Sequence, residues 1–192
     1  MNEYYPDNIL KIPSATPETS DAKQYIIRHK RKQYSLCGEF CVAYVVQDEA
    51  HTDNIDDFLS YWEAKEPKWY ASAFPKGLGR TTGIYDLEKM LFSYGVVTPC
   101  QRFYIPKPTA RNVEEKLINF QAIIGVQIDH TGYLVAKGIP HWVVLDRINV
   151  IDDLHAICDV YNPYTNAIEP YTWKEVMIST GAYKQGIWIN RA

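Results

Sequence analysis

Residues 33–47 read QYSLCGEFCVAYVVQ, an apolar stretch that follows a basic and polar segment. From Cys37 onward apolar side chains occupy most sides of a helix, which is typical of a helix buried in a core. We expect this helix to run from Cys37 to Gln47, with Ser35 as its cap and its end near Ala50. Cys37 would then stand at a helix N-terminus, where the helix dipole and backbone N–H groups lower the pKa of a thiol.

The rest of the chain changes from a helical to a strand-like pattern. Apolar spacing predicts further helices over residues 54–63, 82–94, 109–119 and 172–179, and a Pro- and Gly-bearing loop over 64–82. Runs rich in Val, Ile, Tyr and Trp predict strands over residues 122–128, 141–150, 156–161 and 186–190. We therefore expect an α+β fold, with N-terminal helices packed against a mainly antiparallel sheet.

Length and composition indicate one globular domain. The chain has 192 residues, of which 46% are hydrophobic and 22% charged, and this excludes a disordered or fibrous protein. Residues 1–27 carry three prolines and read as an extended arm, so the domain is expected over 28–192. Four cysteines are too few for a disulfide scaffold, and their spacing does not fit a zinc site.

Charge and hydropathy give no sign of a nucleic-acid or membrane partner. The net charge is −3, and no apolar run approaches the roughly 20 residues that span a bilayer. The polar N-terminus lacks the apolar segment of a signal peptide. We expect a cytoplasmic protein, although export as an effector by a specialised machine would leave no mark in this pattern.

Two later segments complement Cys37. His141 opens the run HWVVL at 141–145, and Asn162-Pro163 follows the next expected strand. If the two strands are neighbours, Asn162 or Asp159 can reach the far nitrogen of His141. Alternation along a strand turns these two side chains to opposite faces, so only one of them can orient the ring. A thiol, a histidine and an orienting group together perform nucleophilic catalysis.

These pieces resemble papain-like cysteine peptidases. The match comprises Cys37-Gly38 at the start of a buried helix, then His141 in HWVVL, then Asn162-Pro163, in that order, and spans roughly residues 30–190 in arrangement. The likeness is greatest to the branch of bacterial peptidases that cut double-glycine leader peptides, and to their stand-alone relatives. It implies a cysteine hydrolase of peptide or protein substrates without cofactor or metal, in which Cys37 attacks, His141 moves the proton and Asn162 orients His141.

Some features leave other interpretations open. The family places its oxyanion glutamine about six residues before the cysteine, where this chain has Arg31. The nearest glutamine, Gln33, lies four residues before Cys37 and is the candidate oxyanion donor, together with the backbone N–H of Cys37. The same three residues would serve a glutamine deamidase or an acyl transferase effector. A binding module that kept the fold without activity is a further alternative. The sequence does not indicate the substrate's identity, an activating partner or the oligomeric state.

Overall fold

The fold is described here from a computed structural model, for residues 37–46, 83–93, 101–104, 109–152, 155–181 and 185–191. The expected arm at residues 1–27, the helix over 54–63 and the loop over 64–82 lie outside these residues. Gln33 and Ser35 lie outside them as well.

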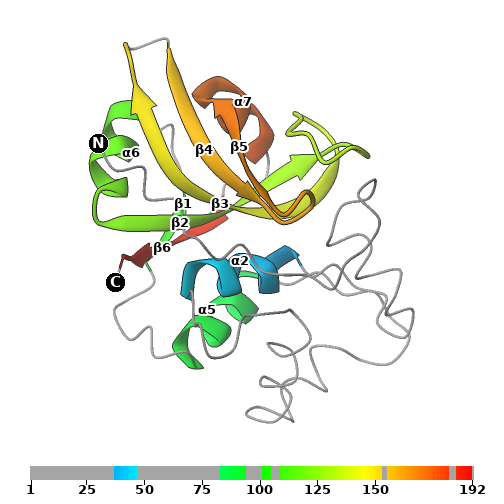
Figure 1. The fold of residues 1–192 in the computed structure, drawn as a ribbon. Helices are drawn as coiled ribbons and strands as arrows, with labels where there is room; N and C mark the ends of the chain where they lie inside the picture. Colours follow the sequence, from blue (N-terminus) through cyan, green and yellow to red (C-terminus); the bar gives the residue numbers. More distant parts are fainter. Residues whose placement is uncertain are drawn as a thin grey trace.

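The described strands form one antiparallel sheet in the order β1-β6-β2-β3-β4-β5 (Figure 1). Their bounds are β1 (Gln101–Tyr104), β2 (Phe120–Ile128), β3 (Ile139–Val150), β4 (Ala156–Asn162), β5 (Ala167–Thr172) and β6 (Gln185–Asn190). Each of the four predicted strands is confirmed, as β2, β3, β4 and β6. The two edge strands, β1 and β5, were not predicted.

The described helices are α2 (Cys37–Val46), α5 (Ile84–Ser93), α6 (Ala110–Leu117) and α7 (Trp173–Thr180). They confirm four predicted helices, and α2 begins at Cys37 as expected. Thr109 caps α6 by accepting a hydrogen bond from the Asn112 backbone N–H. Thr172 and Glu175 form a reciprocal capping box at the start of α7, which satisfies N–H groups that a helix start leaves unpaired.

The helices cover both faces of the sheet. Figure 1 shows α2 and α5 below the sheet and α6 and α7 above it. Two buried clusters correspond to these faces. The first joins α2 and α5 to side chains of the central strands, including Trp142, Val144 and Tyr161. The second joins α6 and α7 to the side chains that the same strands direct to the other face, including Val143, Leu145 and Val160. The chain is therefore α+β, with helices on either side of the sheet.

The first cluster seats α2 on β3 and β4. Phe40 and Cys41 are wholly buried in it, and the ring of Tyr44 stacks on that of Tyr161 with centroids 4.1 Å apart. Gly125 lies opposite Trp142, and a Cβ there would be 3.4 Å from the indole. The glycine thus lets the indole lie close over β2, between the sheet and the helix.

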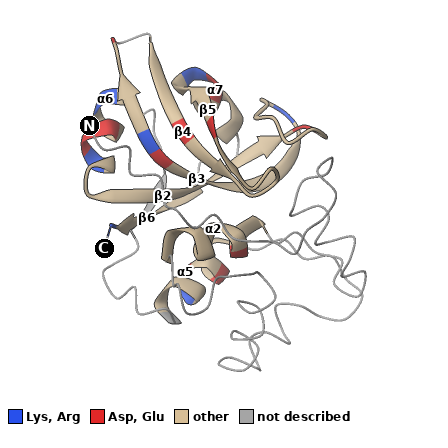
Figure 2. Ribbon diagram, viewed as in Figure 1, with Lys and Arg blue, Asp and Glu red and all other residues tan. Residues whose placement is uncertain are grey.

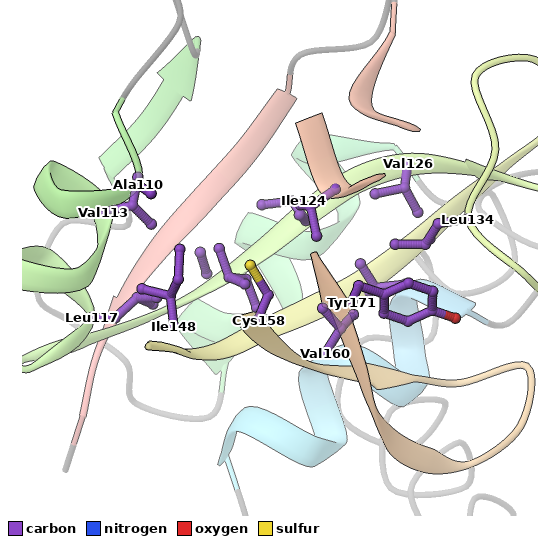
Figure 3. Close-up of a cluster of buried hydrophobic side chains, with 14 of the residues drawn as sticks. Ala110, Val113, Leu117, Ile124, Val126, Leu134, Ile148, Cys158, Val160 and Tyr171 are labelled. Atoms are coloured by element: carbon purple, nitrogen blue, oxygen red, sulfur yellow. The ribbon is translucent and has the colours of Figure 1, made fainter. Parts of the chain in front are cut away.

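The second cluster fills the other face (Figure 3). Ala110, Val113 and Leu117 come from α6, and Cys158, Val160 and Tyr171 come from β4 and β5. In Figure 3 the ring of Tyr171 lies at the edge of the cluster, beside Leu134 from the loop between β2 and β3.

A β-bulge in β3 preserves this division of faces. The register with β4 shifts between Leu145 and Arg147, so that Leu145 and Ile148 both join the second cluster. Asp146, at the bulge, is buried and accepts a hydrogen bond from the Gln121 amide. It also forms an ion pair with Arg191, at an N–O distance of 3.3 Å. This contact anchors the end of β6 to the middle of the sheet.

Acidic and basic residues occur on the same elements, as Figure 2 shows for α6 and α7. No helix among the described residues is long and apolar enough to cross a membrane.

Candidate active site

His141 and Asn162 form a buried hydrogen-bonded pair. His141 is the third residue of β3, and Asn162 is the last residue of β4. The Nε2 atom of His141 lies 3.0 Å from Oδ1 of Asn162, and the two residues are 7% and 0% exposed. Adjacent antiparallel strands therefore bring together two residues that are 21 positions apart.

The Asn162 amide makes four hydrogen bonds, which is all that a side-chain amide can form. Its Oδ1 accepts from His141 and from the backbone N–H of Tyr164, at 3.0 Å each. Its Nδ2 donates to the backbone carbonyl of Gly132 and to Oε2 of Glu169, also at 3.0 Å each. The side chain is fixed in place on both sides.

These partners determine which way the amide faces. A backbone carbonyl and a carboxylate only accept hydrogen bonds, and a backbone N–H only donates. A flipped amide would place its oxygen against two acceptors and its nitrogen against a donor. Oδ1 of Asn162 must therefore face His141, so Nε2 of His141 carries the hydrogen. In the neutral ring this leaves Nδ1 as the proton acceptor.

Burial lowers the pKa of His141 to about 4, while the hydrogen bond to Asn162 and the negative charge of Glu169 oppose that shift. The cause is desolvation, because a buried imidazolium loses its hydration. At neutral pH the ring is uncharged, as a general base must be.

The loop between β2 and β3 holds the pair in place. Gly132 has a φ of +91°, and a Cβ there would lie 2.3 Å from the ring of Tyr164. The Tyr164 hydroxyl donates to the His130 carbonyl at 2.8 Å. The ring thus packs on a site that only glycine can occupy, and this contact places the Gly132 carbonyl against Asn162.

Cys37 is the first residue of α2, and it is buried. It belongs to the cluster that contains Trp142 and Tyr161, the chain neighbours of His141 and Asn162. Successive side chains of a strand point to opposite faces, so Trp142 and Tyr161 point toward α2. Their neighbours His141 and Asn162 point to the other face, toward the loop between β2 and β3. Cys37 therefore shares a buried cluster with the chain neighbours of the pair, whereas the side chains of His141 and Asn162 are turned to the other face of the sheet.

The other described thiols lie in apolar surroundings. Burial raises the pKa of Cys41, and the neighbouring Cys37 and Glu39 raise it further. Burial raises the pKa of Cys158 to about 12, with smaller contributions from Asp159 and Glu175. Both therefore stay protonated at neutral pH and are poor nucleophiles. Among the described residues no group of His, Cys, Asp or Glu is arranged to hold a metal ion.

The two sequence alternatives for the third group are placed differently. Asp159 lies on β4 opposite Arg147 of β3 and Pro170 of β5, three residues before Asn162. Alternation directs it to the face opposite Asn162. The structure brings Asn162, not Asp159, within hydrogen-bond distance of His141, at 3.0 Å.

Sequence reasoning missed Glu169. It lies on β5, opposite Val160, on the same face as Asn162. The missing signal was the hairpin itself: residues 163–166 form its turn, and Asn166 adopts a φ of +53°. Asparagine tolerates this left-handed conformation, so the turn was readable from its composition. Pairing β5 back on β4 would have placed Glu169 beside Asn162.

No family model matches this chain, and no curated protein matches it either.

Proposed function

We propose that the protein is a cysteine-dependent hydrolase that cleaves a peptide or other amide bond through a thioester, with a papain-like arrangement of Cys37, His141 and Asn162. The observation that supports this most is the buried hydrogen bond between His141 and Asn162. An amide fixed on four sides orients the ring and leaves Nδ1 as its basic atom. Cys37 begins α2 in the buried cluster that also holds Trp142, the chain neighbour of His141, and this supports it as the nucleophile.

The proposed reaction has two stages. In the first, Nδ1 of His141 takes the Cys37 proton and the sulfur attacks the carbonyl carbon of the substrate. The tetrahedral oxyanion is stabilised by backbone N–H groups at the start of α2. The imidazolium then gives its proton to the leaving amine, and the C–N bond breaks to leave a thioester.

In the second stage water replaces the amine. His141 takes a proton from the water, whose oxygen attacks the thioester carbonyl. The C–S bond breaks, the product leaves as a carboxylic acid, and the proton returns to the Cys37 sulfur. Asn162 keeps its hydrogen bond to Nε2 throughout, which holds the ring in one orientation.

The test combines labelling with mass analysis. A broad electrophilic peptide probe should form a thioether on Cys37, and a mixture of peptides should yield fragments whose masses correspond to hydrolysis. Cys37→Ala and His141→Ala should each abolish turnover, and the double variant should be little worse than either, because the residues act as one unit. Intact peptides with a mass gain of about one dalton per glutamine would instead indicate deamidation. A probe that leaves Cys37 unlabelled would overturn the proposal.

A further inference from the structure

Glu169 contacts the outer side of the Asn162 amide. Its Oε2 accepts from Nδ2 of Asn162 at 3.0 Å and from the Tyr171 hydroxyl at 2.6 Å. Burial and this hydrogen bond raise the pKa of Tyr171, so the phenol stays protonated and keeps donating. The carboxylate is therefore held on one side by a tyrosine of its own strand, and it presents its charge toward the amide.

Apart from His141, three groups form hydrogen bonds with that amide, and only one of the three is a side chain. The carbonyl of Gly132 and the N–H of Tyr164 belong to the backbone. Glu169 is also the only one of the three that carries a charge. When His141 takes up a proton, the imidazolium is stabilised by a nearby negative charge.

We propose that Glu169 is a positioning residue, which fixes the tautomer of His141 through the Asn162 amide and stabilises the imidazolium that forms during the reaction. The second half of this inference rests on the proposed hydrolase function. The first half concerns the resting protein alone. The chain His141–Asn162–Glu169–Tyr171 is thus one hydrogen-bonded unit that links β3, β4 and β5.

Other titratable groups lie on the elements packed around this unit. They are Asp129, His130, Tyr133 and Lys137 in the loop between β2 and β3, and Lys174 and Glu175 on α7. The Tyr133 hydroxyl donates to Glu175 at 2.6 Å, so the Glu175 carboxylate is paired away from Asn162. Among the described residues, Glu169 is the one whose charge raises the pKa of His141.

Two substitutions separate geometry from charge. In Glu169→Gln the side-chain oxygen still accepts from Asn162 and Tyr171, but the charge is gone. In Glu169→Ala the accepting oxygen and the charge are both lost. The matched control is Glu114→Gln on α6, where a half-buried carboxylate accepts from the Val150 N–H at 2.9 Å, away from the site.

Long-range ¹H–¹⁵N correlation spectra of His141, recorded without substrate, give the first measurement. Wild type and Glu169→Gln should show the hydrogen on Nε2, whereas Glu169→Ala should show a mixture of tautomers. The pKa of His141 should fall by roughly one unit in Glu169→Gln, because a neighbouring negative charge is removed. Unchanged tautomer and pKa in both Glu169 variants would overturn the proposal.

Kinetics give the second measurement. Glu169→Gln should lower kcat roughly tenfold with little change in KM, because the charge acts when the imidazolium forms. Glu114→Gln should leave the spectra and kcat unchanged. If Cys37 proves unreactive while the spectra respond as expected, the hydrolase proposal fails and the positioning of His141 by Glu169 stands. Equal losses of kcat in Glu169→Gln and Glu114→Gln would contradict a specific role for Glu169.

Discussion

At the scale of single residues, the site depends on which side chain of β4 reaches His141. Asn162 contacts the ring at 3.0 Å, and Asp159 lies three residues earlier on the opposite face. Asn162 can therefore hold the imidazole in place. Asp159 instead lies in register with Arg147, on the face of the sheet that α2 covers.

We therefore expect different effects from the two substitutions. Asn162→Ala should lower kcat/KM about 10- to 100-fold, since it orients the ring without reacting itself. Asp159→Ala should change it less than threefold. Steady-state kinetics on a peptide found to be cleaved would measure both. If Asp159→Ala is the crippling change and Asn162→Ala is mild, the third group of the site is Asp159.

The buried ring of His141 also predicts a pH-dependent stability. Its pKa falls from an ordinary value near 6.5 to about 4 in the folded state, so below pH 6.5 the unfolded chain binds this proton more readily. The free energy of unfolding should therefore decrease as pH falls from about 6.5 to 4, by about 3 kcal/mol at most.

Urea unfolding at pH 7 and pH 4.5 measures this decrease. His141→Gln should lose most of the dependence on pH in that window. The control is His155→Gln, which removes a histidine exposed at the β3–β4 hairpin, where it pairs with Asp152 at 2.8 Å. A stability that falls equally with acid in wild type and in His141→Gln would show that the ring is not the cause.

At the scale of elements, the strands that were predicted are those whose side chains are buried. β2, β3, β4 and β6 carry runs of Val, Ile and Trp with long buried stretches. β5 reads AIEPYT, and its Pro170 argues against a strand by local rules. β5 is the last strand of the described sheet, and an edge strand tolerates proline because one side of its backbone need not donate to a neighbour. β1 has only four residues, so its alternation of side chains is too short to predict a strand from sequence.

The candidate site follows the same rule, because local patterns indicate some of its residues and not others. Cys37, His141 and Asn162 could be named from local sequence, because each has a recognisable neighbour or place in an element. Glu169 and the Gly132 carbonyl could not, because their roles depend on β5 and on a loop conformation. Asn162 contacts Gly132 across 30 positions, a pairing that no local pattern encodes.

Gly132 tests the loop as an element. Gly132→Ala should destabilise the protein by about 2 kcal/mol, because the residue has positive φ and a Cβ would overlap the Tyr164 ring. It should also lower kcat, since the carbonyl that fixes Asn162 moves. Thermal unfolding and kinetics measure the two effects. The control is Gly83→Ala, where the nearest contact of a new Cβ is 3.4 Å. Equal losses of stability and of kcat in the two variants would contradict the proposal that this loop holds Asn162 in place.

At the scale of the whole molecule, the sheet separates two clusters and the candidate site lies at its margin. α2 and its thiol belong to the cluster on one face, and the loop and β5 support His141 and Asn162 from the other. The proposed catalysis requires that these two sides act together, with the Cys37 sulfur at Nδ1 of His141. This is the central claim of the account.

Alkylation by iodoacetamide at limiting dose tests that claim most directly, with the labelled cysteine identified by mass spectrometry. In wild type at neutral pH, Cys37 should react before Cys41, Cys158 and Cys100, the last of which lies outside the described residues. In His141→Ala the rate at Cys37 should fall at least about tenfold, because the base that takes its proton is gone. An unchanged rate at Cys37 in His141→Ala, or preferential labelling of another cysteine in wild type, would contradict the account.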